Sequence, residues 1–561
     1  MFIKFCTKRD SWQGNKKSVK SARECNGLVQ AIAAKTENRP KRGIQRMPES
    51  NHNAAHYFVE THLADGRGEN IAFIESTNGK RISYGTLSAN SGKVAGALTK
   101  AGIKREERAA ILMLDSIDCV EIFWGCLKAG VIAVPINTLL ASAVYETILG
   151  DCRASCLFVS AALLEVVKPT LAKNSHIRKV IVVGDHPLKD EFETYETFTH
   201  GAHEQEAVLV SADEPAFWLY SSGSTGQPKG VRHVHSSLQA TSDTYGDKIL
   251  GLIQSDVVFS AAKLFFAYGL GNAMTFPMAV GATTILFDGR PTPPAVMEIF
   301  AGNPAPTIFC GVPTLFGAML VHCDPVEKPE HQLRLCISAG EALPEEIGKK
   351  WEKKFGTEIL DGVGSTEMLH IFLSNRPGDV VYGTSGVAVP GYELRLVDEA
   401  NRDVGIGEIG ELLVCGDSAA EGYWNQRAKS RATFEGRWTR TGDKYEINAK
   451  GRYIYCGRTD DMFKVSGIWV SPFEVEQALL THPAILEAAV VAAIDDDKLL
   501  KPKAYIVLRN SASSNGLEDS IKTHVKDQVG KWKYPRWIEV MKELPKTATG
   551  KIQRFKLRSQ N

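Results

Sequence analysis

The amino-acid sequence predicts an α/β protein: a large N-terminal domain of layered, mostly parallel sheets with a β subdomain, followed by a small α+β C-terminal domain. Its 561 residues are more than one hydrophobic core ordinarily supports. From Ala72 onward, short apolar runs typical of strands alternate with helix-like segments. The pattern changes at Gly383 and again near Gly457–Asp461. We therefore expect a separate segment at 1–46, the N-terminal domain at 47–459 and the C-terminal domain at 460–561.

The alternation of strands and helices begins with a helical repeat of apolar residues between Leu87 and Leu98. An apolar strand follows at Ala109–Met113, then a buried helix at Val120–Ala129 and a strand at Val131–Val134. Further strands are predicted at Ala154–Val159, Val180–Val183, Thr284–Phe287, Thr307–Phe309 and Leu333–Ser338. Short buried strands separated by helices are typical of parallel sheets.

The last third of the chain has a different pattern. Strands and glycine-rich turns at Gly383–Val414 predict the small β subdomain. Beyond Asp461 we expect a helix at Pro472–Leu480 and strands near Ala488–Ala493 and Ala504–Leu508. A further helix is predicted to carry Leu517, Ile521 and Val525 on one face. These roughly 100 residues are enough for a small independent domain.

Charge and hydropathy exclude several classes of protein. Lys and Arg number 66 against 65 Asp and Glu, so the overall charge does not point to nucleic acid or an anionic membrane. The most apolar window, Leu127–Val144, is interrupted by Gly130, Pro135 and Asn137, which argues against a membrane span. The 11 cysteines include no C-x-x-C pair, which favours reduced thiols in a cytoplasmic protein over a disulfide framework or zinc site.

The first 46 residues carry twelve Lys and Arg against three Asp and Glu, with little apolar periodicity. A disordered or artefactual extension is the favoured interpretation, and Met47 is a candidate initiator. A basic organelle-targeting segment and a nucleic-acid-binding arm are the alternatives.

The strongest local motif is Tyr220–Gly230, which follows the apolar run Ala216–Leu219. Glycines allow backbone N–H groups to turn toward one point, hydroxyls donate further hydrogen bonds, and a lysine adds positive charge. The motif is not a Walker A loop, and a flexible linker would not lie between two strand-like runs. We therefore expect a phosphate cradle formed by Ser221, Ser222, Gly223, Ser224, Thr225, Gly226 and Lys229.

Further motifs follow in a fixed order. They are Ser338–Pro344, Asp361–Glu367, Thr439–Asp443, Gly457–Asp461, Val465–Gly467 and Pro545–Lys551. With Tyr220–Gly230, and over roughly Met47 to Arg554, the chain resembles the acyl-adenylate-forming (AMP-binding) superfamily of acyl-CoA synthetases, luciferases and peptide-synthetase adenylation domains.

The resemblance implies ATP, Mg²⁺ and coenzyme A as cofactor and co-substrates, and a role for each motif. Thr366 would hold the α-phosphate, Glu367 would bind Mg²⁺, and Lys551 would bridge the attacking carboxylate and the α-phosphate. Asp443 would accept hydrogen bonds from the ribose, beside Arg458. The adenine and its surroundings would be lined by Gly340, Glu341, Ala342, Asp361, Gly362, Val363, Gly364 and Ser365.

Each assignment has a plainer alternative. Asp443 and Arg458 could form a surface ion pair, and Glu367 could be a carboxylate at a helix N-terminus. Lys551 could be a solvated lysine near the chain end. The resemblance also implies that Lys551 is open to reversible acetylation, with a lysine acetyltransferase and deacetylase as partners.

Two segments, Lys263–Asn272 and Met368–Ile371, resemble the benzoate-CoA ligase branch. Aromatic walls would favour a flat aryl acid, although aromatic runs are more often core. The expected pocket residues are Phe266, Ala267, Tyr268, Gly364, His370 and Ile371. Hydroxybenzoates, other aryl acids and medium-chain fatty acids remain possible substrates.

The acyl acceptor is expected to be free CoA, because no carrier domain follows Lys551. The resemblance places Ser466 and Gly467 beside the pantetheine channel, while Trp532 and Lys533 belong to a basic, aromatic patch that could meet the nucleotide end. It further implies a mobile C-terminal domain that rotates about a hinge at Asp460.

Two other functions compete with CoA ligation: an adenylating enzyme that loads a separate carrier protein, and a non-catalytic nucleotide-binding relative. Thr366, Glu367 and Lys551 argue against the second, since a non-catalytic protein does not need them. A monomer and a homodimer are equally compatible with the sequence.

Overall fold

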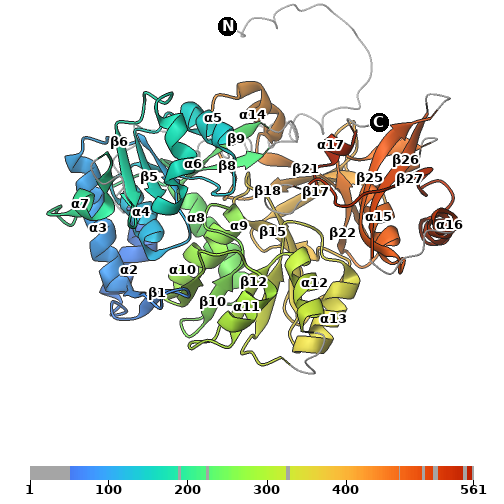
Figure 1. Cartoon of the computed structure of the whole chain (residues 1–561), viewed down its shortest axis with the longest axis horizontal. Helices are drawn as coiled ribbons and strands as arrows, with labels where there is room; N and C mark the ends of the chain where they lie inside the picture. Colours follow the sequence, from blue (N-terminus) through green and yellow to red (C-terminus); the bar gives the residue numbers. More distant parts are fainter. Residues whose placement is uncertain are drawn as a thin grey trace, which may run out of the picture. The chain divides into compact units, whose positions relative to one another are not determined.

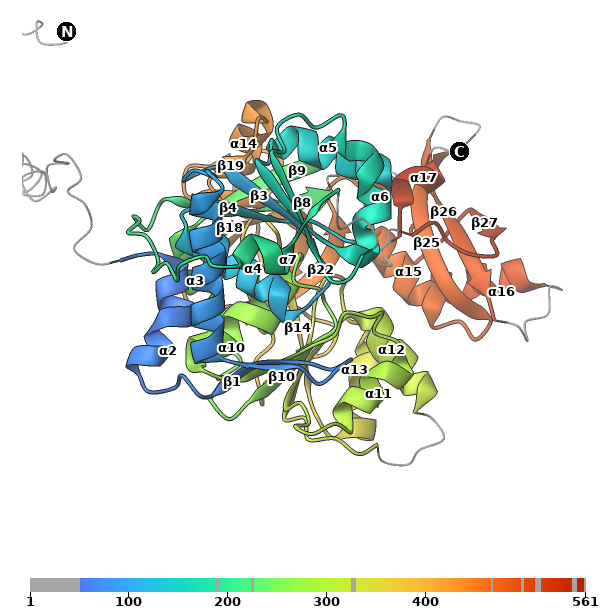
Figure 2. The same cartoon turned by 60° about the vertical axis from the view of Figure 1, so that its left-hand side comes forward.

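The computed structural model describes residues 51–186, 191–222, 227–323, 329–465, 468–495, 499–509, 516–546 and 552–558. The basic segment 1–46 and Met47 lie outside this part of the chain. The described residues form two large mixed sheets, a smaller antiparallel sheet and a C-terminal α+β region, as Figures 1 and 2 show. The predicted α/β fold class is confirmed.

The first large sheet has eight strands in the order β19-β9-β8-β4-β3-β5-β6-β7. Its strands are parallel from β8 to β7, whereas β8–β9 and β9–β19 are antiparallel. The strands are β3 (Arg108–Leu112), β4 (Ile132–Pro135), β5 (Cys156–Ser160), β6 (Lys179–Val183), β7 (Glu193–Thr194), β8 (Pro215–Ser222), β9 (Pro228–Val234) and β19 (Gly422–Tyr423).

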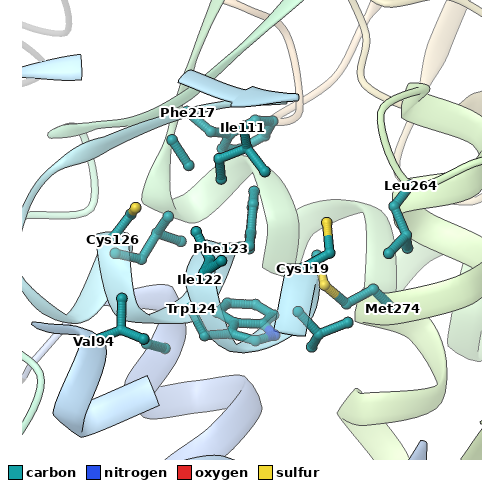
Figure 3. Packing of buried hydrophobic residues seen from close by; sticks show 14 of the residues in the cluster. Val94, Ile111, Cys119, Ile122, Phe123, Trp124, Cys126, Phe217, Leu264 and Met274 are labelled. Carbon is teal, nitrogen blue, oxygen red and sulfur yellow. The ribbon is translucent and has the colours of Figure 1, made fainter. Parts of the chain in front are cut away.

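Helices cover both faces of this sheet because its central strands are apolar on both sides. Ile111 of β3 packs in one core with α3 (Tyr84–Lys100) and α4 (Ile117–Lys128). Figure 3 shows this core around Ile111, Phe123 and Phe217. The next residue, Leu112, faces a second core with α5 (Ser142–Cys152) and α6 (Ala161–Leu171). The helix and strands predicted between Leu87 and Val134 are thus confirmed.

The second large sheet has nine strands in the order β16-β15-β14-β13-β12-β10-β11-β1-β2. It is parallel from β14 to β1 and antiparallel at both ends. The strands are β1 (Ile71–Glu75), β2 (Arg81–Ser83), β10 (Val257–Ser260), β11 (Thr283–Leu286), β12 (Ile308–Gly311), β13 (Leu335–Ser338), β14 (Ile359–Gly364), β15 (Ile371–Ser374) and β16 (Val387–Ala388).

One face of the nine-stranded sheet packs on α11 (Pro293–Phe300), α12 (Pro313–His322) and α13 (Glu345–Phe355) (Figure 2). Phe309, Phe316 and Trp351 form the centre of that core. The remaining short helices of this part of the chain are α2 (Thr61–Ala64), α7 (Tyr195–Thr199), α8 (His235–Thr241), α9 (Ala267–Leu270) and α10 (Phe276–Val280), with π-helical turns η1 (His56–Glu60), η2 (Ser242–Gly246) and η3 (Gly271–Thr275). Of these, α8 and η2 lead from β9 of the eight-stranded sheet to β10 of the nine-stranded sheet.

The β subdomain is larger than the sequence predicted. Its five strands are β17 (Glu393–Val397), β18 (Gly410–Cys415), β20 (Phe434–Glu435), β21 (Trp438–Ile447) and β22 (Tyr453–Arg458), with α14 (Arg427–Thr433) between β19 and β20. The predicted range ended at Val414 because β21 buries the charged residues Asp443 and Lys444 next to Tyr445, so it shows neither a continuous apolar run nor a regular alternation. The extra strands carry Asp443 and Arg458, so this difference bears on the site.

The small C-terminal domain begins with the ribbon of β23 (Phe463–Val465) and β24 (Ile468–Val470). It continues with α15 (Pro472–Leu480), β25 (Ile485–Ile494), β26 (Leu500–Leu508), α16 (Leu517–Val529), β27 (Trp537–Val540) and α17 (Arg554–Arg558). Figure 1 shows α15 beside the three-stranded sheet β25-β26-β27, in orange and red. Ile521 and Val525 of α16 are buried in its core, as predicted. The boundary between residues 459 and 460 stays a prediction.

Candidate functional site

The glycine-rich motif lies at the end of the β8–β9 hairpin of the eight-stranded sheet. Ser221 pairs across the hairpin with Lys229. The hydroxyl of Tyr220 donates to Asp151 Oδ2 at 2.6 Å, which ties the hairpin to the end of α5. Gly223, Ser224, Thr225, Gly226 and the side chain of Ser222 lie outside the described residues, so the predicted cradle itself remains a prediction.

Lys229 and Glu367 come from separate motifs and lie together. Lys229 Nζ is 3.8 Å from Glu367 Oε1 and 4.6 Å from the ring centroid of Tyr423. The Tyr423 hydroxyl donates to the same Glu367 oxygen at 2.8 Å. Burial lowers the pKa of Lys229, an effect that Glu367 opposes and that the neighbouring cations Lys429 and Arg458 reinforce. The cluster thus combines positive charge, which attracts phosphate oxygens, with one carboxylate that can bind a metal ion. A polyphosphate that carries a metal ion requires both.

The loop that carries Thr366 is fixed against β9 by His233. His233 Nε2 donates to the Thr366 carbonyl at 2.8 Å, and its ring stacks on Phe217 with centroids 5.1 Å apart. Burial lowers the pKa of His233 to about 4, so the ring is neutral near pH 7. A second bond runs from the Leu369 N–H to the same carbonyl at 3.2 Å. The Thr366 carbonyl is therefore held by a side chain of β9 and by the turn that follows Thr366.

The predicted adenine residues lie on adjacent parallel strands of the nine-stranded sheet. Ser338, at the end of β13, pairs with Asp361 of β14. Gly340 follows with φ of +94°, a conformation that favours glycine. Burial raises the pKa of Asp361 well above its usual range, and Asp361 Oδ1 has no hydrogen-bond partner among the described residues. The unpartnered Asp361 Oδ1 is therefore available to a hydrogen-bonding group of a bound base.

Asp443 and Arg458 pair across β21 and β22. Arg458 Nη1 donates to Asp443 Oδ1 at 2.9 Å and to the Thr441 carbonyl at 3.0 Å. Asp443 is buried, whereas Arg458 is exposed. Partial desolvation of the guanidinium opposes its charge although the side chain reaches solvent, yet Asp443 raises the pKa of Arg458 above the usual range. The pair is fixed by the sheet register rather than by two free surface side chains, which suits a ribose contact.

In the predicted acid pocket, the structure brings Tyr268 and His370 together. The ring centroids lie 5.8 Å apart, and His370 Nε2 donates to the Tyr268 carbonyl at 3.4 Å. The Tyr268 hydroxyl donates to the Gly311 and Ile337 carbonyls, each at 3.1 Å. Burial lowers the pKa of His370 to about 3. A Cβ on Gly364 would lie 2.5 Å from the His370 carbonyl, so this close approach requires glycine.

The other predicted pocket residues have different surroundings. Ile371 is buried in the core under β14 and β15. Phe266 contacts Phe265 with ring centroids 4.5 Å apart, and Ala267 is half-buried at the start of α9. An apolar cavity lies beside the same segment and is lined by Met113, Cys119, Phe123, Leu264, Phe265 and Met274, among others. Figure 3 shows Cys119, Leu264 and Met274 close to one another.

Asp115 anchors this segment. Its Oδ1 accepts a hydrogen bond from the Leu264 N–H at 3.1 Å, just before Phe266–Tyr268. Asp115 is buried, and burial raises the pKa of its carboxyl to about 6, against the opposing charge of Lys263. Four residues of the site were not predicted from the sequence: Asp115, His233, Tyr423 and Lys429. The one local signal was the place of Asp115 directly after an apolar strand, where parallel strands present functional side chains.

The predicted CoA and hinge residues are only partly described. Ser466, Gly467 and Lys551 lie outside the described residues. Trp532 is exposed, whereas Lys533 Nζ bonds both carboxylate oxygens of Glu474 at 2.7 Å, so its charge is compensated by α15. Asp460 lies two residues after the end of β22, and its carbonyl accepts a hydrogen bond from Arg558 at 2.8 Å.

The described residues fit a Mg²⁺ ion bound mainly by substrate. No group of three or more His, Cys, Asp or Glu that could hold a metal occurs among them. Mg²⁺ commonly uses one or two carboxylates together with phosphate oxygens and water. Glu367, half-buried and beside Lys229, supplies such a carboxylate. In the part of the chain that the structure describes, no helix is long and apolar enough to cross a bilayer.

Two family models match the chain. Residues 61–424 match the model of the AMP-binding enzyme family, and 474–551 match the AMP-binding enzyme C-terminal domain. A 4-hydroxybenzoate–CoA/benzoate–CoA ligase of Rhodopseudomonas palustris is 50% identical over 520 residues, 91% of this chain and 95% of the relative. A benzoate–CoA ligase of Thauera aromatica is 49% identical over 92% of this chain and 97% of its own.

A solved structure has the same fold. The crystal structure of a benzoate CoA ligase from Burkholderia xenovorans superposes with a TM-score of 0.83 at 46% identity, covering 90% of this chain and 99% of the other.

Proposed function

Because this chain belongs to the AMP-binding enzyme family, we propose that it is an ATP-dependent acid–CoA ligase acting on benzoate or a closely related aryl acid. It converts a carboxylate, ATP and CoA into acyl-CoA, AMP and diphosphate through an acyl-adenylate. The relatives with similar length and about half of their residues identical act on benzoate or 4-hydroxybenzoate.

The observation that carries the proposal is the meeting of Lys229, Glu367 and Tyr423. Lys229 follows the glycine-rich loop on β9, Glu367 follows β14, and Tyr423 belongs to β19. They are brought together by contacts of 3.8 Å and 2.8 Å, beside the Asp443–Arg458 pair. A cation, a carboxylate and a ribose-binding acid in one place are the groups that a bound nucleoside triphosphate requires.

In the first half-reaction, the acid carboxylate attacks the α-phosphorus and diphosphate leaves. A Mg²⁺ ion at Glu367 would neutralise charge on the phosphates. Lys229 lowers the negative potential around the leaving diphosphate, while His233 orients the backbone at Thr366. Asp361 and Asp443 position the base and the ribose, and Lys551 reaches the attacking carboxylate. The roles of Glu367, Asp361, Asp443 and Lys551 are the ones that the resemblance implies, whereas those of Lys229 and His233 rest on their contacts.

In the second half-reaction, the CoA thiol attacks the acyl carbon and AMP leaves. Lys551 has no role there, and the thiol arrives past Ser466 and Gly467. The two half-reactions need different protein groups beside the same carboxyl group of the acid. The C-terminal domain therefore rotates about Asp460 between them. Trp532 remains the exposed candidate for contact with the CoA nucleotide, since Lys533 is paired with Glu474.

The acid pocket lies between the Phe266–Tyr268 segment and His370. The rings of Tyr268 and His370 lie with centroids 5.8 Å apart beside this segment, and Gly364 lets the end of β14 approach the His370 backbone closely. His370 is held neutral by burial, so it does not supply a charge to the acid. A flat ring suits this site better than a flexible alkyl chain, which supports an aryl acid over a medium-chain fatty acid.

Three finer points belong to the same proposal. Lys551 is a target for reversible acetylation, which would remove its charge and stop adenylation. The enzyme acts in the cytoplasm, as the free cysteine thiols of the described residues suggest. It works as a monomer or a homodimer, because the proposed site is built from one chain.

The test is a panel of acids assayed for diphosphate release and for thioester formation. Benzoate and 4-hydroxybenzoate, but not hexanoate, should release diphosphate, and CoA should convert the adenylate to acyl-CoA. A carrier protein bearing phosphopantetheine is the matched alternative acceptor. Faster transfer to the carrier than to CoA would contradict the proposal and favour a carrier-loading enzyme.

A further inference from the structure

The peptide groups on either side of the expected hinge are hydrogen-bonded to different domains. On the upstream side, the Thr459 N–H donates to the Gly442 carbonyl of β21 at 2.8 Å. Arg458, one residue earlier, is held by Asp443 and by the Thr441 carbonyl. Everything up to the Thr459 N–H is therefore fixed to the β subdomain.

On the downstream side, Arg558 holds the peptide group that follows Asp460. Its Nη1 donates to the Asp460 carbonyl at 2.8 Å, and its Nη2 donates to Asp461 Oδ1 at 2.6 Å. The carboxylate of Asp461 also lies 3.7 Å from Arg554 Nη1. Two arginines of α17 thus hold the first residues of the C-terminal domain.

Helix α17 is itself fixed to the body of the C-terminal domain. Leu557 is buried against the sheet together with Val491 and Tyr505. Arg554 donates to both carboxylate oxygens of the buried Glu476 on α15, at 3.1 and 2.7 Å. Glu476 Oε1 also accepts the Val490 N–H of β25 at 2.7 Å. Arg558 therefore acts from a rigid support.

The stereochemistry of the backbone then limits where rotation can occur. A rotation about φ or ψ of Asp460 carries the Asp460 carbonyl along with the C-terminal domain, so the Arg558 bond survives it. The Thr459 N–H stays with the β subdomain. Between these two anchors lie only the φ and ψ angles of Thr459 and Asp460. The Asp461 and Met462 N–H groups both donate to the Arg458 carbonyl at 3.0 Å, and these two bonds cross the pivot and must break.

We propose that Arg558 is a positioning residue that clamps the Asp460–Asp461 peptide group to α17 and so confines the domain rotation to Thr459 and Asp460. A hinge of two residues gives each half-reaction a defined domain orientation. Without the clamp, rotation spreads into the residues after Asp461, and both orientations become less well defined. The inference rests on the proposed two-step ligase and adds a residue that touches neither substrate nor nucleotide.

The experiment compares Arg558→Met with wild-type full-length protein. Spin labels placed by non-cysteine coupling at the exposed positions Ile406 and Val540 report the distance distribution between the two domains. The variant should broaden this distribution at a temperature where the protein is fully folded. Single-turnover rates of adenylation and of thioester formation from supplied acyl-adenylate should both fall by about tenfold, since hydrogen bonds to charged groups are being removed.

Three further variants separate the clamp from a general loss of stability. Arg178→Met is the matched control: it removes an exposed arginine that donates to the Gly102 carbonyl at 3.3 Å and to Glu107 at 2.5 Å, at the eight-stranded sheet. It should change neither the distance distribution nor the two rates. Arg558→Lys keeps one donor for the Asp460 carbonyl and should recover part of both rates. If Arg558→Met does not fold, Asp461→Ala, which removes the acceptor of Arg558 Nη2 and the partner of Arg554, should still broaden the distribution.

An unchanged distribution with unchanged rates in Arg558→Met would overturn the proposal. The proposal would also be overturned if the distance distribution kept its width and both single-turnover rates fell only in proportion to the fraction of unfolded protein. Absence of acyl-CoA formation by the wild-type protein would overturn the proposed function instead, and the distance distribution would still test the clamp.

Discussion

Replacing Asp115 with asparagine tests how the acid-binding segment is held. Asp115 Oδ1 accepts the Leu264 N–H from a buried position beneath that segment. An asparagine oxygen can accept the same bond but does not ionise. We therefore expect Asp115→Asn to leave the KM for benzoate unchanged while it alters the dependence of stability on pH.

The size of the effect follows from the pKa of Asp115. Burial raises it from 3.8 to about 6, against the charge of Lys263 and with a small contribution from Asp288. Because the pKa of Asp115 is higher in the folded protein than in the unfolded chain, protonated Asp115 favours the folded state. This contribution to the free energy of unfolding is fully present below pH 3.8 and is lost as the pH rises through about 6. At 1.36 kcal/mol per pKa unit, the loss is on the order of 3 kcal/mol, of which roughly half falls between pH 5 and 7.5.

The assay is denaturant unfolding of wild-type protein and Asp115→Asn at several pH values between 5 and 7.5. The stability of the variant relative to wild type should rise by about 1.4 kcal/mol across this range. Asp115→Leu is the matched control: it leaves a buried N–H unpaired, at about 1–3 kcal/mol, and should raise the KM for benzoate. A stability difference that does not vary with pH would refute the reasoning about Asp115.

The remaining predictions concern the two half-reactions and the pocket. Lys551→Ala should slow adenylation by ~10²-fold or more and spare thioester formation from supplied acyl-adenylate; a normal single-turnover adenylation rate would show that its role is wrong. Ala267→Phe should raise the KM for benzoate by about tenfold or more through overpacking, with the KM for ATP unchanged; equal losses would place Ala267 in the core. Tyr423→Phe removes a hydrogen bond to Glu367, so it should slow adenylation about tenfold and raise the Mg²⁺ concentration needed for half-maximal activity. An unchanged Mg²⁺ dependence would show that Tyr423 does not act on the metal site.

Local sequence signals predicted the elements that they control. The helix α15 begins and ends where expected, because Ser471 accepts the Glu474 N–H as an N-cap and His482-Pro483 follows its last turn. The central strands were identifiable because burial on both faces makes them continuously apolar. The strand β21 was not, because its buried positions include the charged residues Asp443 and Lys444 and follow no regular alternation.

The site residues that the sequence analysis missed act across large sequence separations. The bond from Tyr423 to Glu367 spans 56 positions, the one from Leu264 to Asp115 spans 149, and the one from His233 to Thr366 spans 133. No local pattern records such pairings, because the fold alone brings the segments together. The motif residues were found because they lie in short contiguous runs in a fixed order. Of these, Gly223–Gly226, Ser466–Gly467 and Lys551 lie outside the described residues and stay predictions.

The most direct test of the central claim is the fate of the carboxylate oxygens of the acid. In the proposed reaction one oxygen bonds to the α-phosphorus, and it leaves with AMP when the thiol attacks the acyl carbon. Turnover of benzoate labelled with ¹⁸O in both carboxylate positions, with ATP and CoA, should therefore give AMP carrying one ¹⁸O and benzoyl-CoA carrying the other. Unlabelled AMP, or label in diphosphate or inorganic phosphate, would contradict an acyl-adenylate intermediate.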